Sequence, residues 1–413
     1  MPHEVNEIIG RMHEAVVGFG EYGIRFRDRE GEVEAFLSRV LAASRVGFIY
    51  GPFGAGKSTF LKTLASAMQN TGGVIFVYYD YNVPIVRESM PEVMVYAPVD
   101  IKRVVIEALQ SIQLTSPFVS VNLGEVLKVM LGVLSREGFR DRLRGVEEMV
   151  FVFDEYDRYL KSKASDPNFR DLDYVAGAFA QAIEHADVRR IIFKELADRR
   201  LYFLFPISDQ TALRIAMRLG GKGLTAPYLL WNLPRQAFRE VINEVAELTG
   251  AKNVDVDLLW SLLGGNVRKL EVLVVDYNWD YRRWLQEDVI ERRIIKTLEE
   301  YERAGRFGSI SKVLESLVNK GRTAARDYGL GEFMGQPDAV EGDYGLLENN
   351  IMINLTGAEH LSGLSTEPWI GKRYAYQIPA YYWVLRAMIK KGVNVKPKMC
   401  SRKLMNQEGV KLT

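Results

Sequence analysis

The chain has 413 residues, of which 47% are hydrophobic and 26% charged, and its formal net charge is +1. This length suffices for two or three domains, and the composition excludes disorder over most of the chain. The balanced charge does not by itself indicate a nucleic-acid partner, so such a partner has to be sought in local charge.

The single cysteine, Cys400, excludes an internal disulfide and a zinc site built on cysteines. The first residues lack the basic and then apolar pattern of a signal peptide. No run of about 18 uncharged apolar residues predicts a membrane span. We therefore expect a cytoplasmic protein without a membrane partner.

In the amino-terminal half, short apolar runs alternate with helical segments. The first 45 residues predict a helix at 32–43 and a linker. Strands alternating with helices predict a parallel sheet that is covered on both faces. Pro206 cannot donate to a neighbouring strand and therefore marks a strand end. The predicted strands are 46–50, 74–79, 149–153, 202–207 and 228–233.

After Pro234 the pattern becomes mainly helical, which predicts a small helical domain followed by a further domain. From 321 to 368 the signal weakens, because glycine and aspartate are frequent there. The predicted helices are 235–248, 256–263, 267–275, 288–304, 309–320 and 380–390, and 374–378 alternates like a strand.

The segment Gly51–Ser58 (GPFGAGKS) fits the pattern G-x-x-x-x-G-K-[ST] between an apolar strand and a helix. The glycines let the backbone curl closely around phosphate with its N–H groups pointing inward. Lys57 would reach the β- and γ-phosphates, Ser58 would coordinate magnesium, and the helix dipole would add to the site. The alternative is an ordinary glycine-rich turn. The candidate nucleotide contacts are Gly51, Pro52, Phe53, Gly54, Ala55, Gly56, Lys57, Ser58 and Thr59.

The apolar run 149–153 ends in two acids, Asp154 and Glu155. A carboxylate at the carboxyl end of a parallel strand lies where open α/β sheets bind ligands. Asp154 would hold magnesium, and Glu155 would orient and polarise the attacking water. Alone, the pattern could be a strand meeting solvent. Together with the glycine-rich segment Gly51–Ser58, called the phosphate loop from here on, it favours an ATP-hydrolysing site.

These motifs resemble the AAA+ class of P-loop ATPases, and in particular the archaeal ATPases related to replication-origin initiators and STAND regulators. The segment Phe26-Arg-Asp-Arg-Glu30 is similar to the F-x-x-R-E segment that lies over the adenine in this group. The resemblance therefore implies that Phe26 and Arg27 contact the nucleotide. It covers about residues 22–276.

Three further segments carry the same resemblance. Asp154-Glu-Tyr-Asp157 is similar to the acidic box of the initiators, and Ile207-Ser208-Asp209 falls where the group places a polar sensor. Gly264-Gly-Asn-Val-Arg268 resembles the G-G-N-x-R turn, which implies that Arg268 faces the γ-phosphate. The sensor is usually Asn. Here Asp209 would occupy the sensor position, and its carboxylate would repel the γ-phosphate. Either Ser208 or Gln210 would then act as the sensor instead, or hydrolysis would be slow.

The resemblance also implies an arginine that acts across a subunit boundary and a carboxyl-terminal winged-helix domain. Helices at 290–301 and 310–317, with strands or a wing at 346–354 and 374–378, are compatible with that domain. The candidate arginines are Arg199, Arg200, Arg214 and Arg218, each of which could equally be a surface residue.

Two features of the carboxyl-terminal third could contact nucleic acid. Aromatic side chains alternate with basic ones around Lys372 and Arg373, and such residues stack on bases or, alternatively, form a core. Residues 381–413 contain eight basic residues and a single acidic one, Glu408. This stretch could neutralise phosphates or be a solvated end. The aromatic residues are Tyr374, Tyr376, Tyr381, Tyr382 and Trp383, and the basic ones are Arg386, Lys390, Lys391, Lys396, Lys398, Arg402, Lys403 and Lys411.

We therefore expect an α/β P-loop ATPase domain at 1–234, with 1–25 as helix and linker. A helical lid would follow at 235–285, and a winged-helix-like domain with a basic tail at 286–413. The leading hypothesis is a regulatory ATPase that uses ATP and Mg²⁺ and whose nucleotide state switches the domain arrangement. The alternatives are a DNA-binding initiator or genome-maintenance ATPase that uses ATP as a clamp, and a signalling switch that binds protein. The expected partners are ATP or ADP, with double-stranded DNA and a homo-oligomer as further candidates.

Overall fold

The computed structural model describes the greater part of the chain, which divides into two compact units. The described residues are 2–40, 46–69, 71, 73–81, 92–106, 145–155, 200–207, 225–304, 308–328, 337–340, 346–347, 349–355, 364 and 367–400. The first unit comprises Met1–Ala15, Glu30–Tyr50 and Lys57–Tyr228. The second comprises Val16–Arg29, Gly51–Gly56 and Leu229–Thr413.

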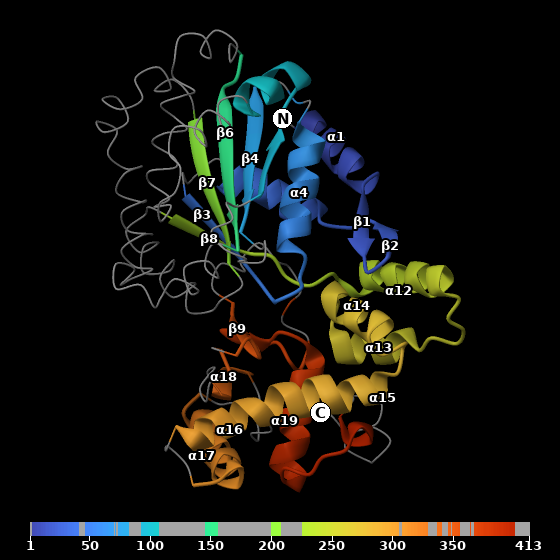
Figure 1. Ribbon diagram of the computed structural model, residues 1–413. Helices are drawn as coiled ribbons and strands as arrows, with labels where there is room; N and C mark the ends of the chain where they lie inside the picture. The colour runs from blue at the N-terminus through green and yellow to red at the C-terminus, as the bar shows by residue number, and fades with distance from the viewer. Residues whose placement is uncertain are drawn as a thin grey trace, which may run out of the picture. The chain divides into compact units, whose positions relative to one another are not determined.

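A six-stranded sheet forms the centre of the first unit, with the strand order β5-β4-β6-β7-β3-β8. Strands β4, β6, β7 and β3 are parallel to one another, whereas β5 pairs antiparallel with β4 at the edge (Figure 1). The predicted, mostly parallel α/β sheet is confirmed, although β5 was not predicted. The strands are β3 (Val46–Tyr50), β4 (Val74–Asp80), β5 (Glu92–Tyr96), β6 (Glu148–Asp154), β7 (Arg200–Ile207) and β8 (Thr225–Leu229).

Stacked aromatic rings hold neighbouring strands of this sheet together. Tyr79 on β4 stacks on Phe153 of β6 with ring centres 5.2 Å apart, and Phe153 stacks on Phe205 of β7 at 5.2 Å. Phe205 in turn stacks on Phe48 of β3 at 5.5 Å. Because side chains alternate between the two faces of a strand, this row lies on one face and fixes the register of four strands.

Helix α4 (Lys57–Met68) packs against β4 and β5, and α1 (Pro2–His13) packs against α4. The predicted strand, loop and helix around the glycine-rich motif are therefore present, with the helix beginning at Lys57. Helix α2 (Glu30–Ala35) begins two residues before the predicted helix at 32–43 and continues as a π-helical turn, η1 (Phe36–Val40).

The second unit begins with a hairpin that the sequence analysis missed. Strands β1 (Val16–Phe19) and β2 (Tyr22–Arg25) pair antiparallel, where a linker was expected. Gly20 and Glu21 form the two-residue turn, and Gly20 has a φ of 58°. Helices α12 (Arg235–Thr249), α13 (Val256–Leu263) and α14 (Val267–Val275) follow close to their predicted bounds.

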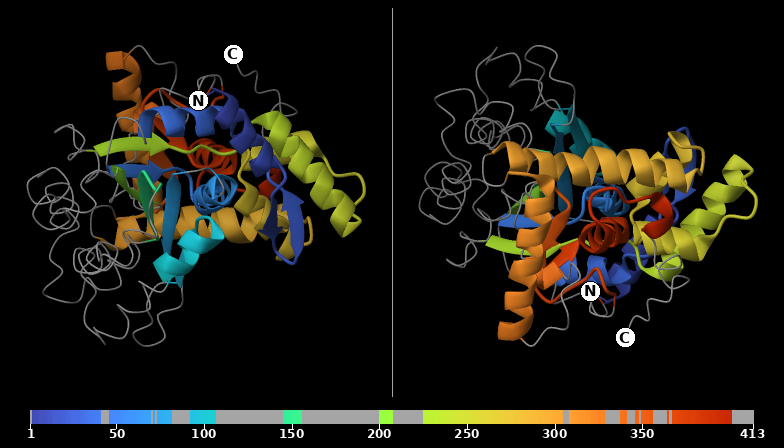
Figure 2. Two further views of the ribbon diagram at one scale, coloured as in Figure 1. Left: turned by 90° about the horizontal axis from the view of Figure 1, so that it is seen from above. Right: turned by 90° about the horizontal axis from the view of Figure 1, so that it is seen from below.

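A continuous helical run then extends over residues 281–303, and its middle eleven residues have π-helical geometry. Helix α19 packs against this run, while α17 extends in a different direction (Figure 2). Strands β9 and β10 form an antiparallel pair within the ranges predicted for a wing. The elements are α15 (Tyr281–Trp284), η3 (Leu285–Ile295), α16 (Lys296–Arg303), α17 (Ile310–Tyr328), α18 (Pro337–Val340), β9 (Met352–Asn354), β10 (Tyr374–Tyr376), α19 (Pro379–Lys391) and η5 (Pro397–Met399).

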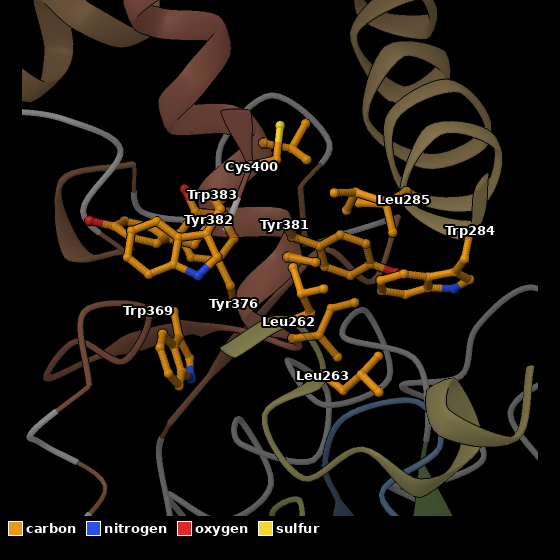
Figure 3. Packing of buried hydrophobic residues seen from close by; sticks show 14 of the residues in the cluster. Leu262, Leu263, Trp284, Leu285, Trp369, Tyr376, Tyr381, Tyr382, Trp383 and Cys400 are labelled. Carbon is orange, nitrogen blue, oxygen red and sulfur yellow. The ribbon is translucent and has the colours of Figure 1, made fainter. Parts of the chain in front are cut away.

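One hydrophobic core runs through the second unit, from the β1–β2 hairpin to Cys400. Four aromatic residues that could have stacked on nucleic acid instead belong to this core, since Tyr376, Tyr381, Tyr382 and Trp383 are at most 3% exposed (Figure 3). The Trp383 indole N–H donates to the Ser261 carbonyl oxygen at 3.0 Å, which anchors α19 on α13. This core contains residues on both sides of position 285, where the helical lid was predicted to end. The predicted domain limits stay a prediction.

Candidate functional site

The carboxyl ends of four parallel strands meet at one edge of the sheet. Tyr50, the last residue of β3, is in register with Ile207 of β7, and Asp80 of β4 is in register with Asp154 of β6. This is the edge at which open α/β sheets bind ligands. Asp154 therefore lies where the sequence predicted it.

Asp154 is only 3% exposed and accepts hydrogen bonds from the hydroxyl groups of Tyr78 and Ser58. Burial raises the pKa of Asp154, and the nearby carboxylates of Glu155 and Asp80 raise it further. The fold thus brings the two predicted magnesium ligands, Ser58 and Asp154, together. A hydroxyl and a carboxylate are the hard oxygen donors that magnesium prefers, so these residues fit the ion.

Tyr78 is a member of this cluster that the sequence analysis did not identify. Burial, together with the charge of Asp154, raises the pKa of Tyr78, which keeps its hydroxyl a neutral donor. Lys62 lies over the Tyr78 ring at 5.1 Å and pairs with Asp80 at 2.8 Å. Tyr78 and Asp80 are two apart on β4, and this spacing could have indicated a shared face.

Glu155 follows the strand in a left-handed conformation, with a φ of 58°. This conformation is uncommon for a residue other than glycine and often marks functional sites. The predicted role of Glu155 in activating water stays a prediction.

Each glycine of the phosphate loop stands where another residue would be strained or would collide with a neighbour. Gly54 and Gly56 have φ values of 85° and 88°, which favour glycine. A Cβ atom on Gly51 would collide with the Leu230 carbonyl oxygen, and one on Gly54 would collide with Arg268. Within the loop, the Ala55 N–H donates to the Pro52 carbonyl oxygen at 3.0 Å.

Side chains from distant parts of the sequence bind the backbone of this loop. The Phe53 N–H donates to Gln377 Oε1 at 2.8 Å, and the Phe53 carbonyl oxygen accepts from Asn266 Nδ2 at 3.0 Å. Arg29 donates to the Ala55 carbonyl oxygen at 2.9 Å. Gln377 was not predicted to have a role, because a contact far along the chain leaves no local sequence pattern. Arg29 is the arginine of the F-x-x-R-E segment, but its contact with the loop was not predicted.

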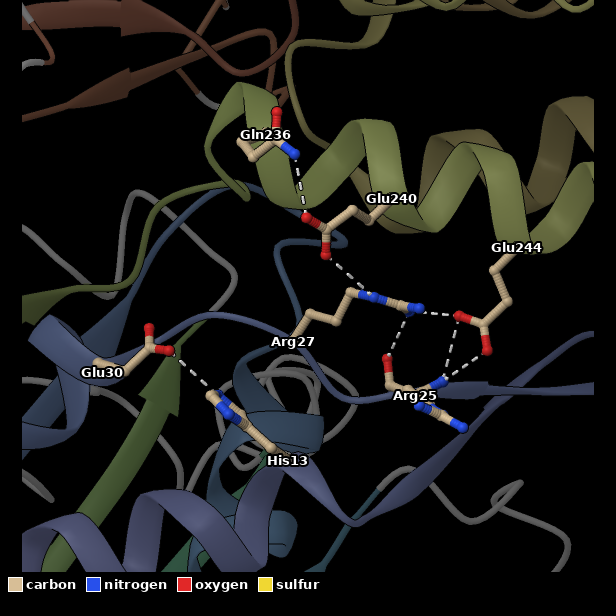
Figure 4. Close-up of polar contacts among 7 residues, drawn as sticks. All are labelled: His13, Arg25, Arg27, Glu30, Gln236, Glu240 and Glu244. Carbon is tan, nitrogen blue, oxygen red and sulfur yellow. Dashed lines mark hydrogen bonds and ion pairs between the residues drawn. The ribbon is translucent and has the colours of Figure 1, made fainter.

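The segment predicted to contact the adenine is fixed on α12. Phe26 is buried, and Arg27 pairs with Glu244 and with Glu240, the latter at 3.4 Å (Figure 4). Arg29, rather than Arg27, is the arginine of this segment that reaches the phosphate loop. Arg29 is buried with a φ of 86°, so the backbone is strained where the contact is made.

Arg268, the second residue of helix α14, lies directly beside Gly54. Its backbone N–H approaches the Gly54 carbonyl oxygen at 3.5 Å. Its side chain is 54% exposed and pairs with Glu271 at 2.7 Å. The G-G-N-x-R turn thus places Arg268 against the phosphate loop. Its predicted contact with the γ-phosphate stays a prediction.

Several predicted residues lie outside the described part of the chain. Of the four candidate arginines only Arg200 is described, and it pairs with Glu148 at the opposite end of the strands from Asp154. The predicted residues outside the described ranges are Asp157, Arg199, Ser208, Asp209, Gln210, Arg214 and Arg218.

The basic stretch after residue 381 is folded as far as Cys400. Arg386 is buried and donates to the Tyr382 hydroxyl at 3.0 Å, so in this arrangement it does not face a ligand. Burial raises the pKa of the Cys400 thiol to about 12. Four lysines of the stretch lie at least partly in solvent, and residues 401–413 lie outside the described part. These lysines are Lys390, Lys391, Lys396 and Lys398.

The profile of a family described as an ATPase domain predominantly from Archaea matches residues 26–273. Among solved structures, the crystal structure of Cdc6p from Pyrobaculum aerophilum is similar, with 14% identity and a TM-score of 0.40, covering 92% of this chain and 98% of that chain. The ORC2 protein of Aeropyrum pernix, in its ADPNP–ADP complexes, has 15% identity and a TM-score of 0.38, covering 91% and 98%.

Drosophila ORC bound to DNA has 12% identity and a TM-score of 0.33, covering 90% of this chain and 97% of that chain. A comparison with curated proteins finds no match. Within the described residues, no helix has the length and apolar character needed to span a bilayer.

Proposed function

Because the chain belongs to a family of ATPase domains found predominantly in Archaea, we propose that it binds ATP with magnesium and hydrolyses the γ-phosphate. The observation that carries the proposal is the contact between Ser58, at the start of α4, and Asp154, at the end of β6. Two motifs almost 100 residues apart in the sequence thereby join into one cluster of magnesium-type ligands.

Each residue of the proposed site has a defined task. The loop backbone and Lys57 bind the phosphates, and Ser58 and Asp154 hold magnesium, which neutralises phosphate charge when it is bound. Glu155 takes up the proton of the attacking water. Arg268 stabilises the γ-phosphate, as its exposed side chain beside Gly54 would allow. Phe26, Arg27 and Ser208 complete the nucleotide contacts in this proposal, as the sequence resemblance implies.

Two substitutions with matched controls test this assignment. Lys57→Ala removes the phosphate contact and should abolish measurable MgATP binding by calorimetry. Glu155→Gln should retain binding and lower turnover by about 100-fold, the size of a general-base contribution. Exposed Lys102 and Glu147 supply the controls Lys102→Ala and Glu147→Gln. Hydrolysis that is unchanged in both Lys57→Ala and Glu155→Gln would disprove the site.

In the finer form of the proposal, nucleotide state switches the arrangement of the carboxyl-terminal part. Arg268 lies beside the loop at the start of α14, and α14 shares a hydrophobic core with α19. An interaction that exists only with γ-phosphate would bias α14 and the elements packed with it. Slow turnover suits such a switch, because the ATP state then persists.

A second candidate function, binding of double-stranded DNA, is favoured by the four lysines between 390 and 400. This stretch contains no acidic residue. Replacing all four with Gln should weaken DNA binding and flatten its salt dependence, by about 0.9 in log–log slope for each phosphate that is no longer neutralised. Lys252→Gln with Lys312→Gln serves as the control.

The same titration separates DNA from protein as the partner. If the unmodified chain does not bind duplex DNA even at low salt, with or without ATP, this candidate function is wrong. Nucleotide-dependent oligomers without DNA affinity would instead support the hypothesis of a protein-binding switch.

A further inference from the structure

A closed ring of hydrogen bonds joins the phosphate loop to three other parts of the second unit. The Phe53 N–H donates to Gln377 Oε1 at 2.8 Å, and the Gln377 carbonyl oxygen accepts from Asn232 Nδ2 at 2.8 Å. Asn232 Oδ1 accepts from Asn266 Nδ2 at 3.0 Å, and the same Nδ2 donates to the Phe53 carbonyl oxygen at 3.0 Å. The ring thus returns to the residue at which it started.

The three amide side chains of this ring are almost fully buried. Gln377 is 3% exposed, Asn232 4% and Asn266 0%. A buried amide without partners is costly, so the set of hydrogen bonds fixes the orientation of each member. Asn266 Oδ1 also accepts from the Lys269 N–H at 3.0 Å, which caps helix α14 and leaves the Asn266 Nδ2 group to face the ring.

Gln377 lies between strand β10 and helix α19, about 320 residues after the loop that it contacts. Its backbone N–H donates to the Ile351 carbonyl oxygen at 2.9 Å, next to strand β9. Pro379, the first residue of α19, lies so close to Gly264 that a Cβ atom there would collide with the proline ring. The β10–α19 junction is therefore fixed to both the phosphate loop and the G-G-N-x-R turn.

We propose that Gln377 is a positioning residue for the phosphate loop, through which the β9–β10–α19 segment sets nucleotide affinity. This inference rests on the proposed function. A glycine-rich loop has many backbone conformations, and each hydrogen bond to Phe53 removes some that do not bind phosphate. Moving the β10–α19 junction would release the Phe53 N–H and lower the affinity. By linkage, nucleotide would stabilise the junction by the same free energy.

Two variants of Gln377 and one control test the hydrogen bond itself. Gln377→Met keeps the length of the side chain but removes the acceptor, whereas Gln377→Glu keeps an acceptor. Tyr382→Phe is the control, because it removes a buried hydrogen bond on α19 without contacting the loop. In nucleotide-free protein, amide exchange of the 51–57 peptide should be about tenfold faster in Gln377→Met and unchanged in the other two.

MgADP titrations of the wild type, Gln377→Met and Tyr382→Phe then test the consequence for binding. All are measured below the melting temperature of the least stable variant, so that an unfolded fraction does not contribute. Gln377→Met should bind about tenfold more weakly than the wild type, and Tyr382→Phe should bind equally well.

The result that overturns the inference is wild-type affinity and wild-type exchange in Gln377→Met. An equal loss of affinity in Gln377→Met and Tyr382→Phe would also overturn it, since the effect would then be general destabilisation of α19. Failure of the proposed function is distinguishable, because MgADP would then bind wild type and Lys57→Ala alike. If Lys57→Ala loses binding and Gln377→Met does not, this inference alone is wrong.

Discussion

Asp154 occupies a position that costs stability, because its carboxylate is buried near two others. It is buried beside Asp80 and Glu155, and burial raises its pKa. The hydroxyl groups of Tyr78 and Ser58 donate to the carboxylate and offset part of that cost. In the proposed function a magnesium ion would offset the rest, so that the metal-free site is strained electrostatically.

We therefore predict that Asp154→Asn stabilises the metal-free protein. At pH 7.5 the variant should melt roughly 2 °C higher, because about 1 kcal/mol of desolvation cost is removed. A raised folded-state pKa means that the cost is complete above that pKa and disappears below the ordinary aspartate pKa. The difference in melting temperature should therefore shrink as the pH falls. A variant that melts lower than the wild type at pH 7.5 would contradict this account.

Gly54 and Gly56 have nearly the same φ but different surroundings, which permits a matched prediction. Gly56→Ala adds a methyl group to open space and should cost about 1 kcal/mol for its left-handed conformation alone. Gly54→Ala carries the same strain and also drives its methyl group into Arg268. Thermal melting should rank Gly54→Ala clearly below Gly56→Ala. Equal melting temperatures would mean that Arg268 is not held against the loop.

At the scale of elements, what could be predicted from sequence depended on how local the signal was. The buried strands β3 and β6 and the helices α13 and α14 were predicted almost to the residue, because the apolar run of each strand and the helical periodicity of each helix extend over the whole element. The family membership confirms the archaeal ATPase resemblance that rested on the same local motifs.

The elements that were missed have weak or interrupted signals. The β1–β2 hairpin was missed because glycines interrupt a short alternating run, although Gly20 and Glu21 between Phe19 and Tyr22 are typical of a two-residue turn. The edge strand β5 was missed because it is short and only partly buried. Gln377 could not be found from sequence, because its importance lies in a contact across 324 residues. Arg29 is the arginine of the F-x-x-R-E segment, but its contact with Ala55 across 26 residues was not predicted.

The segment Phe26–Glu30 and helix α12 are joined by the ion pairs of Arg27 with Glu240 and Glu244, and these pairs define a prediction about the segment. If Arg27 acts by positioning the segment on α12, then Glu244→Gln should weaken MgADP binding as much as Arg27→Met does. The double variant should be no worse than either single one, which corresponds to a coupling of about 1 kcal/mol. Additive losses in the double-mutant cycle would instead indicate that Arg27 contacts the nucleotide directly.

At the scale of the whole molecule, the second unit connects the nucleotide motif with the carboxyl-terminal elements. One core extends from Phe19 and Ile24 in the hairpin through α12–α14 to α19. The amide ring ties Phe53 of the phosphate loop to this unit at the β10–α19 junction. Because packed cores shift between discrete arrangements rather than deform continuously, a local change at the loop can bias the whole unit.

The proposed switch predicts that ATP and ADP give different solution structures, and that Arg268 is needed for the difference. The Glu155→Gln variant, which we expect to hydrolyse ATP slowly, should hold ATP long enough for small-angle scattering with MgATP and MgADP. The two curves should differ in Glu155→Gln and coincide once Arg268→Ala is added.

Arg268 is exposed, so its removal should leave the melting temperature nearly unchanged. Exposed Arg303 on α16 provides the control Arg303→Ala, which should preserve the difference. Identical curves for MgATP and MgADP in Glu155→Gln, with binding of both verified by calorimetry, would rule out the switch. Hydrolysis would then be the only consequence of ATP binding, because a ligand cannot shift a conformational equilibrium without differential affinity for its states.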